Sequence, residues 1–575
     1  MAARSTTCCG SAEVVPATSA SPNGALTVSE RRAVIALLLV FVALLFVELP
    51  GSWLMEPDEA RYAEIPREML ATHDYVTPRL NDAHYFEKPP LLYWANALSM
   101  RAFGLNAYAA RLPTRLAALG TAAIVGFELE TPALAGWGLW AALILLSAPL
   151  SFVLGRYNLT DGILTCAMTG AFFALRRFLL SRERGARAVG ALAALGACVA
   201  LAVLAKGLIG IVFPGLVLLI WAGGTGRWRR VGEALWSPAP LVFLVVAVPW
   251  FVLVQRAAPD FATIFFIREH VSRFATGEAK RAGPVYYFVA AVIAGFVPWT
   301  FVTPRTVRQV AESWRERAAA HADDVFFAIW FCVILVFFSV SRSKLLPYIL
   351  PAFPAAAALV ARAILTRTES MRRPLVVHAI VVTLVAVGGA AYGIASGELR
   401  RYDVTWLAAL GAVLLVAGAW TGVALAREHG RRAMFPAALG WGGLYLAIIL
   451  AMPRVADDLS GHNLALVAAR TPDARVVSYR CYPQDFPWVL RRPIAVADYV
   501  DELGSDDVRP PEYYWTRDEF WKRWNAGEHL VVVVKRRTRA EFDRSSVRGT
   551  PLAANRKYVV LANFPAAAAS PNLAR

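Results

Sequence analysis

One polar segment has the sequence Met55-Glu56-Pro57-Asp58-Glu59-Ala60-Arg61-Tyr62-Ala63-Glu64, and the rest of the chain is organised around it. It directly follows the first apolar stretch, and it is the most charged segment of its length in the apolar part of the chain. A helix here places Asp58, Arg61 and Tyr62 on one side, because residues three and four apart share a face. The alternative is an amphipathic linker lying on a membrane, with Asp58 as the helix N-cap.

A second polar run, Tyr85-Phe86-Glu87-Lys88-Pro89-Pro90, follows the first one. Proline is tolerated in the first turn of a helix, so a helix is predicted to begin at Leu91. Glu87 and Lys88 then lie at the N-terminus of that helix. Both polar runs fall between the first and second apolar stretches of the chain.

The composition is that of a membrane protein. Charged residues make up 18% of the 575, below the roughly 25% of soluble proteins, and the mean hydropathy is +0.47. Apolar runs close to the length needed to cross ~30 Å of hydrocarbon recur along most of the chain. We therefore predict a polytopic α-helical membrane protein, whose helices satisfy their own backbone hydrogen bonds as lipid requires.

About 13 spans are predicted. They lie at 33–50, 107–128, 133–152, 161–180, 188–205, 208–223, 238–256, 284–304, 325–341, 345–362, 374–395, 404–426 and 434–452. With the N-terminus in the cytoplasm, all five of the longer inside loops are rich in Arg, as the positive-inside rule requires. Most of the net charge of +17 therefore faces anionic lipid, and the sequence has no nucleic-acid-binding motif.

Three regions follow from this topology. Residues 1–30, rich in Ala, Ser, Thr, Pro and Gly, are predicted to be a disordered cytoplasmic N-terminus. Residues 31–452 form the transmembrane domain, in which 51–106 is the first external loop with its amphipathic helices. Residues 453–575 form a small external α/β domain.

The α/β assignment of the last region rests on strands that alternate with helices. Strands are predicted at 475–479, 493–496, 529–534 and 558–562. Capping boxes at Thr516 and Thr538 predict two helices between them. The region has no Gly-rich phosphate loop and no catalytic triad, so we expect it to cover the external face of the membrane domain.

Ionisable residues stand at the external ends of several predicted spans, where Lys and Arg are uncommon. They include Arg156, Asp161, Lys206, Arg268, Glu269, His270, Arg273, Arg342 and Lys344. Each alone can snorkel to the surface. Charged groups at membrane depth usually face a cavity or each other, so clustering on one side favours a shared site. Lys and Arg bind phosphate by charge and multiple donors, which predicts an anionic, lipid-borne ligand.

The chain resembles the bacterial lipid A 4-amino-4-deoxy-L-arabinose transferase family in these charged segments. That family falls within the lipid-linked integral membrane glycosyltransferases, which include the protein O-mannosyltransferases. The matching motifs are Asp58-Glu59-Ala60-Arg61-Tyr62-Ala63-Glu64, Arg67-Glu68-Met69-Leu70, Tyr85-Phe86-Glu87-Lys88-Pro89, Ala205-Lys206-Gly207, Glu269-His270, Arg273-Phe274 and Lys344-Leu345-Leu346-Pro347-Tyr348-Ile349-Leu350-Pro351. The first external loop is the most specific part, and the C-terminal third adds little.

The resemblance implies a reaction. An aminoarabinose unit moves from undecaprenyl phosphate to a phosphate of lipid A at the periplasmic face of the bacterial inner membrane. This lowers the negative charge of lipid A and gives resistance to polymyxin and cationic peptides. The N-terminus is then cytoplasmic, while the site and the C-terminal domain are periplasmic.

The resemblance also assigns roles to residues. It implies that Asp58 is the principal catalytic carboxylate, and that Arg61, Asp161 and Lys206 complete the catalytic group. Lys88, Arg273 and Tyr348 match positions that hold the donor phosphate. Further candidates for the substrate cavity are Glu59, Tyr62, Tyr85, Arg342 and Lys344.

The chemistry of the reaction supports some of these roles. Lys88 and Arg273 can stabilise the charge that develops on the departing phosphate. The acceptor phosphate is largely ionised at neutral pH and needs less help from a base than a hydroxyl does. Asp58 therefore either takes a proton or positions Arg61, Lys206 or the sugar amine, and the sequence leaves this choice open.

Glu87 and His270 are two candidate ligands for a divalent cation such as zinc, although two ligands from two loops are a weak signal. We expect that no cofactor is required. The expected partners are the undecaprenyl phosphate-linked sugar donor, the lipid A acceptor and membrane lipids, with no nucleic acid, and the protein is expected to be a monomer.

Two alternatives remain at this stage. A protein O-mannosyltransferase-like enzyme, or another polyprenyl-phosphate-sugar transferase, has the same carboxylate loop but a different acceptor. A lipid transporter or flippase is the alternative that is not an enzyme. It should show internal repeats and broken helices at corresponding positions of two halves, and no such symmetry is visible in the sequence.

Overall fold

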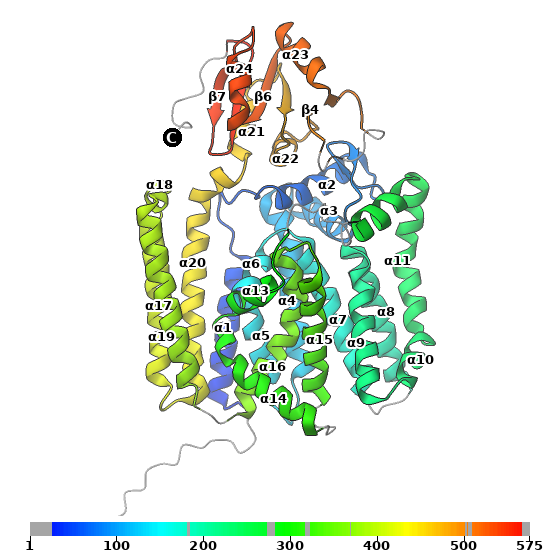
Figure 1. Ribbon diagram of the computed structural model, residues 1–575, viewed down its shortest axis with the longest axis vertical. Helices are drawn as coiled ribbons and strands as arrows, with labels where there is room; N and C mark the ends of the chain where they lie inside the picture. The colour runs from blue at the N-terminus through cyan, green and yellow to red at the C-terminus, as the bar shows by residue number, and fades with distance from the viewer. Residues whose placement is uncertain are drawn as a thin grey trace, which may run out of the picture.

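A helical membrane domain carries a small α/β domain on one end in the computed structural model (Figure 1). The structure describes residues 26–180, 185–272, 282–316, 322–367, 370–500, 503 and 509–565, with the side chains of 268–272 left out. Helices α2 (Asp58–Thr72) and α3 (Leu91–Phe103) lie across the ends of the membrane helices, between the two domains (Figure 1).

Most membrane helices are long and continuous. The first, α1 (Val28–Phe46), begins with a capping box between Thr27 and Glu30. The others are α4 (Ala107–Leu129), α7 (Thr160–Leu180), α8 (Ala186–Lys206), α9 (Ile209–Thr225), α11 (Pro238–Ala257), α15 (Ala322–Val340), α16 (Phe353–Thr366), α17 (Arg372–Ala395), α19 (Thr405–Leu425) and α20 (Met434–Leu459).

Two predicted spans are bent helix pairs. Helix α5 (Trp137–Ser147) meets α6 (Pro149–Arg156) at 67°, at a proline that cannot continue the hydrogen-bond ladder of α5. Helix α13 (Tyr287–Gly295) meets the segment Trp299–Glu316 at 105°. The second half of that segment is α14 (Thr303–Glu316), which therefore turns away from the direction of α13.

The prediction of a polytopic helical membrane protein is confirmed, but the count of 13 is not. In the described part of the chain, 9 helices are long and apolar enough to cross a membrane, or up to 11 with the bent pairs. Helix α9 is shorter, and α1 carries Glu30, Arg31 and Arg32 in its first turns. Residues 28–30 are helical, which corrects the prediction of disorder there, and residues 1–25 lie outside the described residues.

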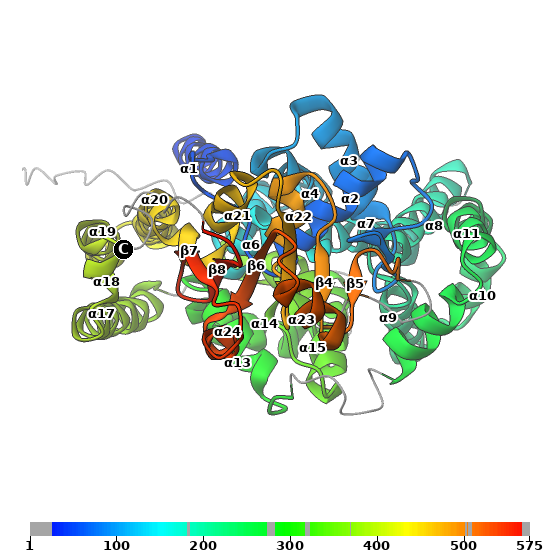
Figure 2. The same cartoon turned by 90° about the horizontal axis from the view of Figure 1, so that it is seen from above.

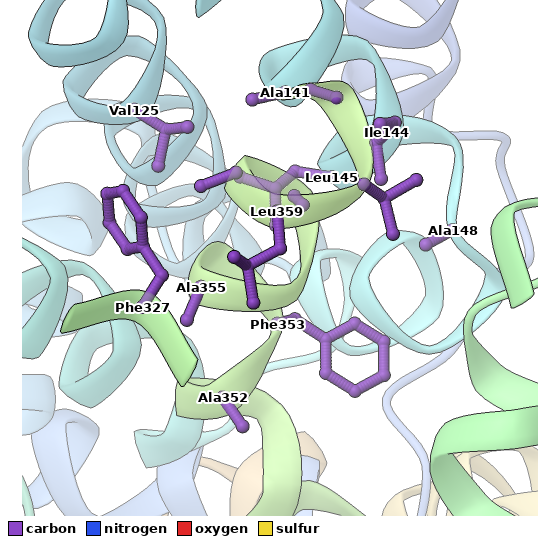
Figure 3. Close-up of a cluster of buried hydrophobic side chains, with 14 of the residues drawn as sticks. Val125, Ala141, Ile144, Leu145, Ala148, Phe327, Ala352, Phe353, Ala355 and Leu359 are labelled. Carbon is purple, nitrogen blue, oxygen red and sulfur yellow. The ribbon is translucent and has the colours of Figure 1, made fainter. Parts of the chain in front are cut away.

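Small residues let some helices in the core of the membrane domain approach each other closely. Every residue of α5 except Leu139 is buried, and α16 packs against it with side chains that include Ala355 and Leu359 (Figure 3). A side chain on Gly138 of α5 would meet the backbone oxygen of Gly126 of α4, with only 1.8 Å from its Cβ to that oxygen. Glycine at Gly138 is therefore required for the contact between α4 and α5.

The first external loop has the predicted helix boundaries. Helix α3 begins at Leu91 after Pro90, as the two prolines predict. Helix α2 begins at Asp58 with Pro57 as its N-cap, so Asp58 is not the cap. The interior of α2 from Glu59 to Met69 is buried throughout, whereas a linker lying on a membrane would expose one face. The surface-linker alternative is therefore wrong.

The C-terminal domain contains a six-stranded mixed sheet of order β5-β4-β3-β6-β8-β7 (Figure 2). Its strands are β3 (Arg475–Tyr479), β4 (Ala495–Ala497), β5 (Tyr514–Trp515), β6 (Leu530–Lys535), β7 (Thr550–Ala554) and β8 (Tyr558–Ala562). Strands β5, β4, β3 and β6 are parallel, and β8 and β7 add antiparallel strands at one edge. The predicted α/β class is confirmed.

The sequence missed several elements of this domain. They are β5, β7, α21 (His462–Ala469) and α22 (Asp485–Leu490). The capping box at Thr516 is present and begins α23 (Arg517–Asn525). The box predicted at Thr538 is wrong, because a 3₁₀ turn runs directly into α24 (Arg539–Asp543) and leaves Thr538 with a helical backbone.

Candidate functional site

The first turn of α2 presents a carboxylate to the solvent. The side chain of Asp58 is 44% exposed, and an Oδ1 atom lies 3.7 Å from Nη2 of Arg61 one turn along the helix. Arg61 itself is buried, and its Nη1 donates a hydrogen bond of 3.2 Å to Oη of Tyr85. A carboxylate here is also favoured by the partial positive charge of the helix N-terminus. Asp58 is therefore a charged group with little packing around it.

Three buried tyrosines stand behind this carboxylate: Tyr62, Tyr85 and Tyr93. Burial raises the pKa of each well above its usual value, and the negative charge of Glu87 raises the pKa of each further. All three therefore remain protonated at neutral pH and can donate hydrogen bonds. Among the described residues, Oη of Tyr93 has no hydrogen-bond partner.

Lys88 lies shortly before α3, in the same external loop as Asp58. Nζ of Lys88 lies 3.9 Å from Oε2 of Glu87 and donates a hydrogen bond of 3.0 Å to its backbone oxygen. Both side chains are only partly buried. The charge of Glu87 raises the pKa of Tyr62 and Tyr85, so Glu87 interacts with the buried tyrosines next to the Asp58 turn.

A second group lies at the ends of the membrane helices. Asp161 in the first turn of α7 forms an ion pair with Lys206, the last residue of α8. Gly207 ends α8 with φ +85°, a conformation that glycine adopts without strain. Nζ of Lys206 lies 4.5 Å from the ring centroid of Tyr348, which belongs to the 3₁₀ segment Leu346–Ala352.

Asn158, just before α7, contacts both α2 and α3. Its Oδ1 accepts a hydrogen bond of 2.9 Å from Nδ2 of Asn96 on α3, which also donates to the backbone oxygen of Tyr62. Its backbone N–H donates to Oε1 of Glu59 at 2.9 Å. Helices α2 and α3 are thus held to the start of α7, whose first turn contains Asp161.

Glu59 does not face a cavity. Its carboxylate is 2% exposed and accepts hydrogen bonds from Nε and Nη2 of Arg111 at 2.8 and 2.7 Å. Burial opposes its charge, but Arg111 outweighs this and lowers the pKa of Glu59. Arg111 and Arg115 also bind Glu48, so the group ties α2 to α4 and to the chain after α1. This corrects the assignment of Glu59 to the substrate cavity.

Two other predicted cavity residues, Arg342 and Lys344, follow the end of α15. Nζ of Lys344 is buried and donates to the backbone oxygens of Phe338 and Ser339 at 2.9 and 2.7 Å, which closes the end of α15. Arg342 is exposed. The structure gives Lys344 a capping role, so its assignment to the cavity is also corrected.

Some predicted residues cannot be placed. Arg273 lies outside the described residues, and the side chain of His270 is not described, although its backbone belongs to the π-helix Thr263–Ser272. Among the side chains that are described, no three His, Cys, Asp or Glu residues could hold a metal ion together. A cation between Glu87 and His270 stays a prediction.

Sequence reasoning missed Tyr93, Asn96 and Asn158. Tyr93 and Asn96 are three residues apart on α3, so they share one face of that helix. Asn158 lies three residues before Asp161. Polar residues at helical spacing inside the largely apolar run after Pro90 were the available signal.

Comparisons with known proteins agree with this arrangement. Residues 32–265 match the family described as dolichyl-phosphate-mannose-protein mannosyltransferase, and residues 464–563 match the aminoarabinose transferase C-terminal domain. The C-terminal third, which we expected to add little, thus has a family match of its own.

Individual relatives match much of the chain. An undecaprenyl phosphate-alpha-4-amino-4-deoxy-L-arabinose arabinosyl transferase of Edwardsiella ictaluri is 31% identical over 457 residues, which cover 77% of this chain and 80% of that protein. A relative of the same name, numbered 1, from Proteus mirabilis is 32% identical over 58% of this chain and 60% of its own length.

A solved structure also matches. The crystal structure of ArnT from Cupriavidus metallidurans bound to undecaprenyl phosphate is 31% identical, with a TM-score of 0.83 over 94% of this chain and 99% of that one. The similarity includes the membrane helices and the sheet, so the chain is an integral membrane glycosyltransferase. Within that class it belongs to the family of undecaprenyl phosphate-alpha-4-amino-4-deoxy-L-arabinose arabinosyl transferases. The resemblance drawn from the external loop is confirmed, and the transferase is favoured over a transporter.

Proposed function

We propose that this protein transfers 4-amino-4-deoxy-L-arabinose from undecaprenyl phosphate to a phosphate of lipid A. The observation that carries the proposal is a set of charged pairs where the membrane helices meet α2 and α3: Asp58 with Arg61, Glu87 with Lys88, and Asp161 with Lys206. A lipid phosphate lies at that depth in a bilayer. The names of the relatives and the undecaprenyl phosphate in the similar crystal structure support the donor.

The reaction breaks the bond between the anomeric carbon of the sugar and the donor phosphate oxygen. An oxygen of the lipid A phosphate forms the new bond to that carbon, and undecaprenyl phosphate leaves with the electron pair. We propose that Lys88 and Arg273 bind the phosphate and stabilise its developing charge, and that Tyr348 donates a hydrogen bond to it. Lys206, held by Asp161 beside the ring of Tyr348, adds positive charge.

Asp58 is proposed as the catalytic carboxylate. It is exposed, and its ion pair with Arg61 is loose, which leaves its oxygens available to a substrate. The acceptor phosphate is already ionised, so no proton has to be removed from it. Asp58 then acts by orienting Arg61 or the sugar amine. The buried tyrosines Tyr62 and Tyr85 fix Arg61 from behind.

The C-terminal domain, residues 453–575, is proposed to cover this site on the periplasmic side of the inner membrane. Its support is the docking of Asn81, in the first external loop, onto the sheet domain. Nδ2 of Asn81 donates to the backbone oxygen of Ile494 at 3.0 Å, and the N–H of Ile494 donates back at 2.9 Å. Residues 31–452 form the catalytic membrane domain, residues 1–30 remain cytoplasmic, and the protein acts as a monomer.

Mass spectrometry of lipid A tests the function. Cells with the gene should contain lipid A heavier by one aminopentose unit than cells without it. Unchanged lipid A would contradict the proposal. The match of 32–265 to the mannosyltransferase family supplies a second candidate, a sugar transfer to polypeptide. Purified protein offered lipid A or peptide with the same donor separates the two.

A chelator tests the cation predicted at Glu87 and His270. We expect transfer to persist, because Lys88 and Arg273 can meet the charge of the leaving phosphate without a metal. Complete loss of transfer that added zinc restores would make Glu87 and His270 ligands of a required ion. A pH profile would not decide this question, because His and the acceptor phosphate both titrate near ~6 to 6.5.

A further inference from the structure

The position of Asp58 is set by the backbone before it, because its exposed side chain packs against little. Two neighbouring residues hold that backbone. On one side, the N–H of Met55 donates to Oε2 of Glu59 at 3.0 Å, which ties it to the membrane domain. On the other side stands Glu56, two residues before Asp58, which neither the motif nor the comparisons assign to the site.

Glu56 is held by the C-terminal domain. Its side chain is 2% exposed, and Oε2 accepts hydrogen bonds from Nζ of Lys557 at 2.7 Å and from Oη of Tyr558 at 2.9 Å. Its backbone N–H donates to the oxygen of Leu459, at the end of α20, at 3.3 Å. Hydrogen bonds to a charged group are among the stronger ones in proteins. Glu56 is thus fixed from β8 and from α20.

The turn between β7 and β8 that supplies these donors is itself fixed. Nδ2 of Asn555 donates to the backbone oxygens of Asp457 and Ser460 at 3.0 and 3.1 Å. Its Oδ1 accepts from the N–H groups of Lys557 and Tyr558. The donors to Glu56 therefore sit on a turn that is pinned to the end of α20.

A second buried carboxyl faces Glu56. Oδ2 of Asp485 accepts hydrogen bonds from Ser460 and from the N–H of Gly461, while its Oδ1 and Oε1 of Glu56 have no donor among the described residues. Burial, then the charge of Glu56 and a hydrogen bond to it, raise the pKa of Asp485 well above its usual range. One proton shared between these two oxygens satisfies both.

We propose that Glu56 is a positioning residue for Asp58, and that Lys557 and Tyr558 of the C-terminal domain act on the reaction through it. The domain then does more than cover the site, because it holds the chain two residues from the catalytic carboxylate. The inference rests on the proposed function in one respect, namely that Asp58 takes part in transfer.

Variants of the full-length purified protein test the proposal. Glu56→Gln should lower kcat about tenfold, while the KM for the lipid donor stays within about twofold, because one charge-assisted contact is lost away from the donor. Lys557→Met should lower kcat less, and the double variant should be no worse than Glu56→Gln alone. Arg556→Met is the matched control, because Arg556 lies on the same turn but its exposed side chain pairs with Glu398 at 3.0 Å. It should transfer at the wild-type rate.

Hydrogen exchange gives a readout that does not depend on activity. Glu56→Gln and the milder Tyr558→Phe should speed exchange at residues 58–62, while Arg556→Met should not. Unchanged exchange and unchanged kcat in Glu56→Gln would overturn the proposal, as would additive losses in the double variant. If the wild-type protein transfers no sugar to lipid A, the proposed function fails, and the exchange data still decide whether Glu56 positions the Asp58 turn.

Discussion

Two clusters of opposite charges begin at neighbouring residues of α2. The site cluster contains Asp58, Arg61, Glu87 and Lys88, whose ion pairs are 3.7 and 3.9 Å long and whose carboxylates reach solvent. The anchor cluster contains Glu48, Glu59, Arg111 and Arg115, in which Arg111 binds both carboxylates at 2.7 Å and both arginines are buried. Asp58 and Glu59 are adjacent in α2, yet the carboxylate of Asp58 is exposed and that of Glu59 is buried.

The difference shows how a structural charge can be told from a chemical one. In the anchor cluster every carboxylate oxygen already accepts a hydrogen bond, so a substrate could bind there only by breaking the fold. In the site cluster both carboxylates are partly exposed, and their ion pairs with Arg61 and Lys88 are long. Removing a charge from the first cluster should therefore cost stability, and removing one from the second should cost activity.

Arg111→Met should have the largest effect, on stability. It leaves Glu59 without its buried partner and Glu48 with Arg115 alone, and breaking a buried ion pair by removing one side costs about 3–5 kcal/mol. A thermal unfolding scan in detergent should show a much lower Tm, or the protein should not accumulate in the membrane. A normal Tm would contradict the anchoring role.

Asp58→Asn should abolish transfer, with a loss of at least about a hundredfold in kcat, and should leave the Tm close to that of the wild type. The change is isosteric and its site is exposed, so folding should not suffer. Asp543→Asn, a change at another exposed carboxylate that also has a loose ion pair, is the control and should be fully active. Near wild-type turnover of Asp58→Asn at equal protein levels would remove Asp58 from the mechanism.

Lys88→Ala and Lys344→Ala should separate two lysines that the sequence placed together. Lys88→Ala should raise the KM for the lipid donor about tenfold and change the KM for lipid A little, because a charge-assisted contact to the donor phosphate is lost. Lys344→Ala should instead lower the Tm, because the carbonyls at the end of α15 lose their donor. Equal effects on both substrates in Lys88→Ala would argue against donor binding.

Asp485→Asn should have the smallest effect, and one that depends on pH. The raised pKa of Asp485 means that the folded protein keeps a proton that the unfolded chain releases above pH ~4. Stability therefore falls as the pH rises from there towards the folded pKa. The amide stays neutral and can donate to Glu56. The difference in the free energy of unfolding between the variant and the wild type should therefore favour the variant by about 1 kcal/mol more at pH 8 than at pH 5. An equal change in Tm at both pH values would contradict the shared proton.

The sequence was sufficient wherever one local rule decided the structure. Apolar length predicted the membrane helices, Pro90 predicted the start of α3, and the Thr516 box predicted α23. Prediction from the sequence failed where a contact with a distant segment determined the role of a residue. Only the fold brings Arg111 to Glu59, a pair 52 residues apart, and that contact makes Glu59 structural.

The same reason explains what was missed in the site. Lys344 follows the end of α15 closely enough to cap it, but a cap and a ligand look alike in sequence. No sequence signal marked Glu56 as part of the site, because its partners, Lys557 and Tyr558, are about 500 residues away. The short strand β5 pairs only along two residues and carries too little periodicity to be seen.

The right-angled turn between α13 and α14 has a consequence for the membrane itself. Helix α14 buries Arg305, Gln309 and Ser313 against the protein and exposes Val307 and Trp314, at the end of the molecule away from the C-terminal domain (Figure 1). A tryptophan on such a helix belongs at the boundary between acyl chains and headgroups. The distance between α14 and α2 across the membrane therefore sets the hydrophobic thickness that matches the protein. In a bilayer of another thickness the helices must tilt or the lipids must stretch, and the donor phosphate then sits at a different height from Asp58. The rate of transfer should accordingly pass through a maximum as the acyl chains of the host lipid are lengthened.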